Sequence, residues 1–315
     1  MPTADRTAPA VSKGRCGSGA MGSATRRLST TIAAIVLLSR KLVDPLPPDP
    51  TSPFDTVGAV LSAVGMLLVV VGILQAGDNR PLMVVLLALG AAFLFWFFLH
   101  IRARERAGKE PLLSTALFRN RTSNLGLVTQ NVQWLLLVGI SFVVSVFLQT
   151  VRGYNAIQTG VIFTATTVGI LVSSLAAERL ASRRAQKTPI LAGFVTTIVG
   201  IGLLIGLVTA SQSIWAFVPG LLLIGLGLGV MLTPSVNVVQ SAFPEDQQGE
   251  ISGLSRSVSN LGSSLGTAIA GTILVSDLAA GNRSYALAMA SLAVIGLIGL
   301  GAALLLPSNP VPQQA

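Results

Sequence analysis

The sequence is poor in the residues from which most enzyme and metal sites are built. It holds one cysteine, Cys16, and one histidine, His100, so this chain alone can form neither an internal disulfide nor an ordinary His/Cys zinc site. Charged residues make up only 10% of the 315 residues. No aspartate or glutamate lies in the middle of a long apolar stretch, which leaves no acids for a membrane enzyme or an intramembrane metalloprotease. We therefore expect no enzyme activity, no catalytic residues, no metal ion and no cofactor.

The chain is instead rich in long apolar runs, with 51% hydrophobic residues and a mean hydropathy of +0.74. A helix rises about 1.5 Å per residue, so roughly 20 apolar residues cross the hydrocarbon core of a bilayer. Eight stretches of about this length lie at residues 55–76, 81–101, 126–150, 157–178, 189–210, 214–240, 253–276 and 284–306. They predict an all-α integral membrane protein with eight transmembrane helices.

Positive charge alternates between successive loops. If each stretch crosses the membrane once, one set of loops holds 13 Lys and Arg residues and the opposite set holds three. The first set comprises Arg40, Lys41, Arg102, Arg104, Arg106, Lys109, Arg119, Arg121, Arg179, Arg183, Arg184, Lys187 and Arg256, and the second comprises Arg80, Arg152 and Arg283. Cytoplasmic loops carry such an excess, so we expect the first set and the C-terminal tail to face the cytoplasm. The net charge of +9 then reflects membrane orientation, and we expect no nucleic-acid partner.

The N-terminal segment has a different composition. Residues 1–27 are rich in Gly, Ala, Ser, Thr and Arg, which predicts a disordered basic tail. The apolar run from Ile32 to Leu38 is too short to cross a membrane, and Arg40 follows it where a secretory signal would have a small-residue cleavage site. A Pro-rich stretch comes next. We interpret residues 28–54 as a truncated helix remnant and a Pro-rich linker.

Several short sequence motifs are distributed along residues 54–276. Residues 214–276 contain Gly225-Leu-Gly227-Leu-Gly229, Pro234, the turn Pro244-Glu245-Asp246, and Asn260-Leu-Gly262-x-x-x-Gly266. Upstream of them stand Phe54-Asp55-x-x-Gly58, Pro111-Leu-Leu113 with Leu117-Phe-Arg119, and Phe147-Leu-Gln149 with Gly153-Tyr-Asn155. In combination these motifs resemble the C-terminal portion of major facilitator superfamily transporters, specifically the fourteen-helix drug:proton antiporter family of multidrug efflux pumps.

The resemblance covers about residues 30–306 and implies a division of the chain. It makes residues 55–101 the family's two extra transmembrane helices, 102–125 a basic cytoplasmic loop, 126–306 the six-helix C-terminal bundle and 307–315 a cytoplasmic tail. In this register the chain begins at the end of the family's sixth helix, and the first six-helix bundle is absent. The loop at 177–184 departs from the superfamily's loop motif, because an aspartate is expected near Ser182.

Polar side chains inside the apolar stretches form stripes. Such groups are expensive in a membrane unless they face protein or a water-filled cavity, so their positions map the interior. At 100° per residue, the stripes consist of Gln130, Trp134, Ser141 and Ser145; of Arg256, Asn260, Ser263 and Thr267; and of Thr233, Asn237 and Gln240. The stretches 189–210 and 284–306 are nearly bare. This matches the resemblance, in which the third and sixth helices of a bundle stand outside the central cavity.

The stripes supply the candidate substrate-binding residues, which are Gln130, Trp134, Ser141, Ser145, Asn237, Asn260 and Ser263. Amide and indole groups suit a pocket for amphipathic cations. The alternative for each residue is hydrogen bonding between helices, which contributes about 0.6 kcal/mol per contact and is the usual role of intramembrane Ser and Thr. The glycines of the motifs, including Gly262 and Gly266, are interpreted as helix-packing positions and not as a nucleotide-binding loop.

The resemblance implies a multi-pass transporter of the plasma or inner membrane that exports small molecules by proton antiport. The expected partners are the lipid bilayer, an amphipathic small-molecule substrate, the proton, and either a separate N-terminal half or a second copy of the chain. Because no span has a central carboxylate, an acid that carries the proton would have to lie elsewhere. The alternative is a non-transporting membrane relic or a partner subunit of a split transporter.

Overall fold

The structure is a computed structural model that describes residues 55–75, 79–108, 113, 115–181, 186–210, 213–244, 247–275 and 282–307. The expected basic tail, the segment 28–54 and Ser182 lie outside these residues, as does the tail beyond Pro307. All regular structure within the described residues is helical.

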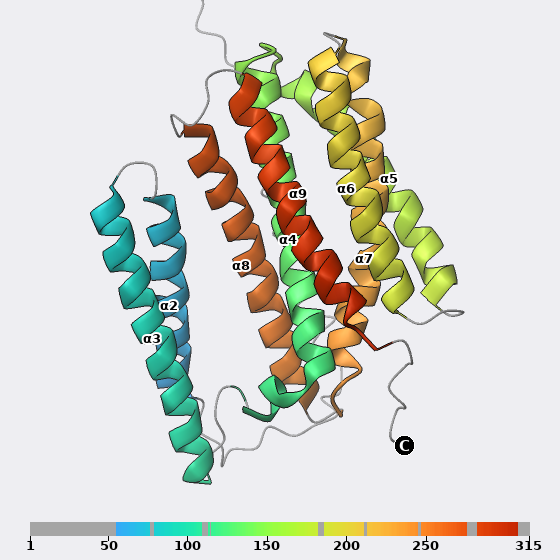
Figure 1. Ribbon diagram of the computed structural model, residues 1–315. Coiled ribbons are helices and arrows are strands. Elements are labelled where there is room, and N and C mark those ends of the chain that lie inside the picture. Colours follow the sequence, from blue (N-terminus) through green and yellow to red (C-terminus); the bar gives the residue numbers. More distant parts are fainter. Residues whose placement is uncertain are drawn as a thin grey trace, which may run out of the picture. The chain divides into compact units, whose positions relative to one another are not determined.

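Eight of the described helices are long and apolar enough to cross a membrane, which confirms the predicted all-α membrane fold. They are α2 (Thr56–Leu74), α3 (Arg80–Arg106), α4 (Arg121–Thr150), α5 (Ala156–Ala181), α6 (Lys187–Ala210), α7 (Val218–Gln240), α8 (Gln248–Val275) and α9 (Asn282–Leu304) (Figure 1). The short 3₁₀ helices η1 (Thr115–Arg119) and η2 (Ile214–Ala216) precede α4 and α7.

Some helices extend past the apolar runs that predict them. The helix α3 continues to Arg106, and α4 begins at Arg121, although the apolar runs end near residue 101 and start near residue 126. The side chain of Asn120 explains the start of α4, because its Oδ1 accepts hydrogen bonds from the backbone N–H groups of Thr122 and Ser123 at 3.0 and 3.2 Å. Capping and charged residues therefore extend these helices beyond the apolar segments that lie among the lipid tails.

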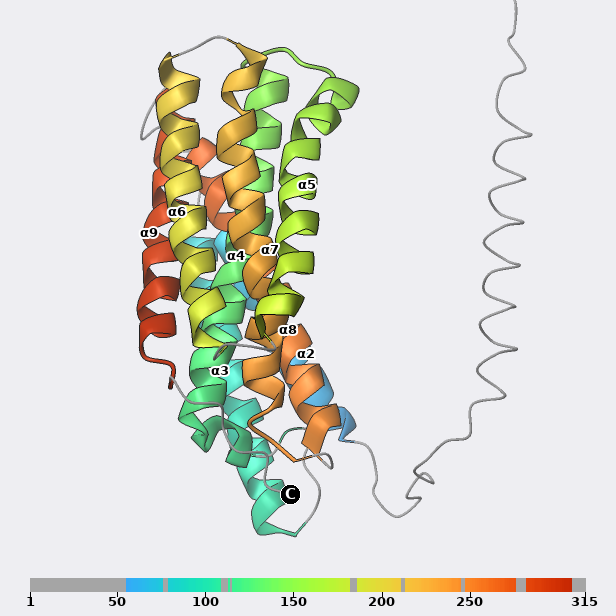
Figure 2. The ribbon, with the colours of Figure 1, turned by 90° about the vertical axis from the view of Figure 1, so that its right-hand side faces the viewer.

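The last six helices pack around a central pair, α4 and α7. The helix α8 packs along α4, and α5 packs along α7. The helices α6 and α9 contact each other and the central pair, and Figure 2 shows them on the side away from α5. The core between these helices contains fully buried side chains such as Leu136, Ile140, Phe194, Leu221 and Leu292.

Glycines make the closest helix contacts possible, as the sequence predicts. A Cβ atom on Gly225 or Gly229 of α7 would collide with α5 at Thr166 O or Ser173 Oγ. A Cβ on Gly262 or Gly266 of α8 would collide with backbone carbonyl oxygens of α4. These glycines let two helix backbones touch directly, which is the small-residue packing typical of membrane helices.

The hairpin of α2 and α3 is joined at one end by an ion pair. The carboxylate of Asp55 accepts a hydrogen bond from the backbone N–H of Gly58 at 2.9 Å and so caps α2. His100 Nε2 lies 3.0 Å from Asp55 Oδ1, and Arg104 Nε lies 3.6 Å from Asp55 Oδ2. His100 is therefore more than the interfacial residue that its position in the sequence indicates. At the other end of α2, Thr272 Oγ1 of α8 donates to the carbonyl oxygen of Ile73 at 3.5 Å.

Candidate functional site

The side chain of Gln130 forms hydrogen bonds between α4 and α8. Its Nε2 donates to Ser259 Oγ and its Oε1 accepts from Ser255 Oγ, each at 2.9 Å. Gln130 is 3% exposed and both serines are buried. One residue further on, Asn131 Nδ2 donates to the carbonyl oxygen of Val258 at 2.9 Å. In this conformation both polar atoms of Gln130 are engaged between the helices.

Two polar residues of the α8 stripe are exposed. Arg256 and Asn260 are exposed, and they lie next to Ser255 and Ser259, the two serines that bind Gln130. Trp134 is half-buried and lies one turn beyond Gln130 on α4. The hydrogen bonds of Gln130 therefore join the two helices, α4 and α8, that carry the two longer stripes.

The hydroxyl groups of the set bond within their own helices. Ser141 Oγ donates to the carbonyl oxygen of Leu137 at 2.6 Å, and Ser263 Oγ donates to that of Ser259 at 3.1 Å. Ser145 Oγ accepts from Gln149 Nε2 at 2.9 Å. All three serines are half-buried. Each hydroxyl keeps further hydrogen-bonding capacity, because a hydroxyl has one donor and two acceptor positions.

Asn237 is the one candidate residue on α7, and it lies near the C-terminal end of that helix. It is half-buried, and its neighbours Val238 and Val239 pack against Gly126 at the start of α4. Gln240, three residues later, donates through Nε2 to Ser252 Oγ of α8 at 3.2 Å. Gln240, the last residue of the short α7 stripe, thus links the C-terminal end of α7 to the N-terminal part of α8.

Ser255, Ser259 and Gln133 are not among the residues that the sequence pattern predicts for the site. The two serines form a second stripe one residue away from the predicted α8 stripe, and their spacing of four residues is the available signal. Gln133 is 1% exposed, and neither its Oε1 nor its Nε2 has a hydrogen-bond partner among the described residues. A buried amide of this kind is costly in a membrane helix, so Gln133 joins the candidate residues.

Ionisable groups are scarce in the part of the chain that the structure describes. No group of three or more His, Cys, Asp or Glu side chains there is arranged to hold a metal ion. The carboxylates at described positions occur at helix ends, as in Asp55 before α2, Glu105 late in α3 and Glu250 in the first turn of α8. The site around Gln130 is accordingly one of amides, hydroxyls and an indole, with the cation of Arg256 at its edge.

The sequence of the chain matches a known protein family. A family model described as Major Facilitator Superfamily matches residues 56–267 and 132–314. Together the two matches cover every described transmembrane helix. The resemblance seen in the motifs is confirmed.

The curated relatives of the chain include several drug-resistance and export proteins. The chain is 28% identical to the multidrug resistance protein Stp of Mycobacterium tuberculosis over 72% of its length. It is 29% identical to the puromycin resistance protein pur8 of Streptomyces alboniger over 70%, and 26% identical to a probable actinorhodin transporter of Streptomyces coelicolor over 78%. The matched region covers 42% of the length of Stp and 44% of each of the other two proteins.

Proposed function

The chain belongs to the major facilitator superfamily, and we propose that its last six helices form one wall of the central cavity of a drug-efflux transporter. The substrates are amphipathic small molecules, which leave the cell in exchange for protons. The protein lies in the plasma or inner membrane with its C-terminus in the cytoplasm. The names of the relatives support export of drug-like compounds, and the alternation of loop charge supports the orientation.

The observation that carries this proposal is the uneven distribution of polar groups over the bundle. Arg256 and Asn260 are exposed on α8, and Trp134 is half-buried on α4, the helix that packs along α8. By contrast, beyond Arg283 at the start of α9, the exposed large side chains described on α6 and α9 are apolar, as with Val199 and Val294. A polar face and an apolar face on one bundle are expected when the first faces a cavity and the second faces lipid.

The bonds of Gln130 give this wall its fixed geometry. With both polar atoms bound to serines of α8, the amide holds α4 and α8 in register. We propose that Gln130 acts mainly through this position, and that Trp134, Asn260 and Ser263 contact the substrate. The free capacity of Ser141 and Ser145 supplies further hydrogen bonds along α4, and Asn237 lies at the cytoplasmic entrance.

A second wall is required for transport. Transporters of this type rock two bundles around a site near the middle of the membrane, so that the site opens to each side in turn. The helices described here supply one bundle and the α2–α3 hairpin. An N-terminal half would supply the other bundle and the acid that binds and releases the proton, whereas a second copy of the chain could supply the bundle but not that acid, because its spans hold no central carboxylate.

The test compares two serines with the same local bonding. Ser263 Oγ on α8 donates to a carbonyl oxygen of its own helix, and so does Ser291 Oγ on α9, to Ala288 at 2.8 Å. Export of several fluorescent amphipathic cations is measured in cells that carry the chain in its native genomic setting. Ser263→Ala and Asn260→Ala are expected to change the relative export rates of the dyes, whereas Ser291→Ala leaves them unchanged.

Two results would contradict the proposal. One is an equal effect of Ser263→Ala and Ser291→Ala on every dye, which would reduce both serines to packing positions. The other is unchanged dye export after deletion of the gene, which would favour a relic without transport activity. Membrane levels of each variant, measured by immunoblot, separate a change in specificity from a loss of protein.

A further inference from the structure

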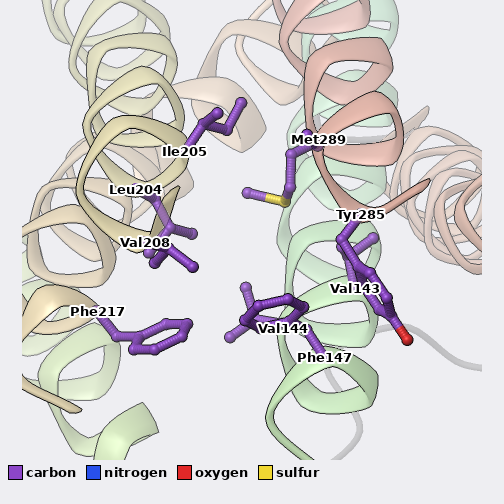
Figure 3. Close-up of a pocket in the computed structure, with 10 residues that line it drawn as sticks. Val143, Val144, Phe147, Leu204, Ile205, Val208, Phe217, Tyr285 and Met289 are labelled. Atoms are coloured by element: carbon purple, nitrogen blue, oxygen red, sulfur yellow. The ribbon is translucent and has the colours of Figure 1, made fainter. Parts of the chain in front are cut away.

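An apolar pocket lies between α6 and α9, on the side of the bundle away from α5. Its volume is about 60 Å³, enough for roughly four groups the size of a water molecule or a methylene. Figure 3 shows Leu204 and Val208 of α6 on one side, Tyr285 and Met289 of α9 on the other, and Phe147 of α4 between them. Phe217, just before α7, closes the pocket next to Val208.

Close contacts join α6 and α9 at the end away from the pocket. Lys187 Nζ, at the start of α6, donates to the carbonyl oxygens of Leu304 and Leu306 at 2.6 and 2.7 Å. Further along, a Cβ atom on Gly299 would lie 2.5 Å from the Phe194 ring, so the two helices touch there. Towards the other end the pocket takes the place of such contacts. We call this space the α6–α9 wedge.

The surroundings of the wedge are apolar. On α9, Leu287 and Val294 are 45% and 59% exposed, and on α6 Val199 is 55% exposed. In a helix that crosses a bilayer, large apolar side chains with this exposure are covered by lipid tails. An occupant of the wedge therefore reaches it from the bilayer.

The mouth of the wedge carries a cation and two hydroxyl groups. The guanidinium carbon of Arg152 lies 5.5 Å from the centre of the Phe147 ring and 6.0 Å from that of Phe217, and both rings line the pocket. Arg152 Nη2 donates to the carbonyl oxygen of Val208 at 3.2 Å. Tyr285 Oη and Thr150 Oγ1 share a hydrogen bond of 2.8 Å on the opposite side.

We propose that the α6–α9 wedge binds a phospholipid with an anionic headgroup from the leaflet on the Arg152 side. One acyl chain enters the apolar pocket, and the headgroup lies against Arg152 and Tyr285. Arginine and tyrosine are the side chains that commonly anchor proteins at the level of lipid headgroups. This lipid would fill the space where α6 and α9 separate, on the face of the bundle opposite to the proposed transport wall.

The test uses the full chain in phosphatidylcholine vesicles that contain a trace of photoactivatable lipid. The probe is phosphatidylglycerol or phosphatidylcholine with a diazirine in the upper part of one acyl chain, and cross-linked peptides are identified by mass spectrometry. The phosphatidylglycerol probe is expected to label residues 204–208 and 285–289 about fivefold more than the phosphatidylcholine probe, which corresponds to about 1 kcal/mol of attraction between one arginine and an anionic lipid.

Paired variants separate the wedge from general lipid contact. Arg152→Gln is expected to bring the labelling ratio close to one, whereas Arg283→Gln, which removes an exposed cation near the start of α9, leaves the ratio unchanged. Ala286→Trp fills the pocket and removes labelling at 204–208. Ala290→Trp places the same ring on the exposed face of α9 and leaves that labelling intact.

A competition experiment needs no variant. Excess unlabelled phosphatidylglycerol is expected to displace the probe from residues 204–208, while inorganic phosphate and phosphatidylcholine do not. Equal labelling by the two probes in the unmodified chain, or labelling spread evenly over all exposed apolar residues, would overturn the proposal. Displacement by inorganic phosphate alone would also overturn it, since the site would then bind the anion without its lipid.

Discussion

His100 Nε2 lies 3.0 Å from Asp55 Oδ1, and this contact joins the end of α3 to the start of α2 across 45 residues of chain. The Asp55 side chain is only 1% exposed, so its charge depends on protein partners and not on water. The same carboxylate caps α2 through Gly58 and lies near Arg104. One residue therefore starts a helix and closes the hairpin that contains it.

We predict that Asp55→Ala and Asp55→Asn separate these two roles. Asparagine retains a cap for α2, whereas alanine loses it at a cost of about 1 kcal/mol, and both variants remove the charge beside His100 and Arg104. Hydrogen exchange of the amides at residues 57–62 is expected to quicken most in Asp55→Ala and less in Asp55→Asn. Equal protection in all three proteins would show that Asp55 does not hold the hairpin.

We predict that Gln130→Leu weakens the contact of α4 with α8. The variant loses two interhelical hydrogen bonds, so its free energy of unfolding in mixed micelles should fall by roughly 1 kcal/mol. Gln149→Leu is the matched control, because Gln149 is exposed and bonds to Ser145 within its own helix. A loss of the same size in the control would mean that the interhelical bonds contribute nothing measurable.

We predict that alanine at Gly266 is destabilising and alanine at Gly253 is not, although both glycines lie in α8. A Cβ atom at Gly266 would collide with the carbonyl oxygen of Leu135, and overpacking of this kind costs about 1–3 kcal/mol. Nothing lies within 4 Å of a Cβ atom at Gly253, so Gly253→Ala should leave stability unchanged or raise it slightly. Thermal unfolding in detergent measures both, and similar midpoints for the two variants would rule out the close α4–α8 packing.

The sequence predicted the helices better than it predicted their contacts. Length and hydropathy suffice for eight spans, since the bilayer sets the number of apolar residues that a helix needs. Helix ends such as Asn120 depend on capping, which the apolar pattern does not contain. Glycine spacing correctly predicted close packing at Gly262 and Gly266.

The candidate site shows where reading single helices fails. A stripe on one helix cannot tell which polar residue faces a neighbour, because the neighbour's position is set by packing. Gln130 and Trp134 belong to one predicted stripe, yet Gln130 is buried against two serines of α8 and Trp134 is half-buried. The contact between Asp55 and His100 could not be predicted for the same reason, since it joins residues far apart in the chain.

We predict the orientation from the loop charges. After replacement of Cys16, a cysteine at Lys109 should not react with a membrane-impermeant thiol reagent in intact cells, whereas a cysteine at Asn155 should. The cytoplasmic side is expected to hold the loops with 13 of the 16 cations beyond residue 27. Reaction of both sites in permeabilised cells is the control, and the reverse pattern in intact cells would invert the topology.

If these helices form one wall of a transporter, they require a second bundle to transport. The most direct test is efflux of an amphipathic fluorescent cation from vesicles that contain only the purified chain, with and without an imposed pH gradient. The chain is expected to insert as a monomer and to show no gradient-driven efflux, because alternating access needs a second bundle and the described spans hold no central carboxylate. Robust gradient-driven efflux by a demonstrated monomer would show that a second bundle is not needed.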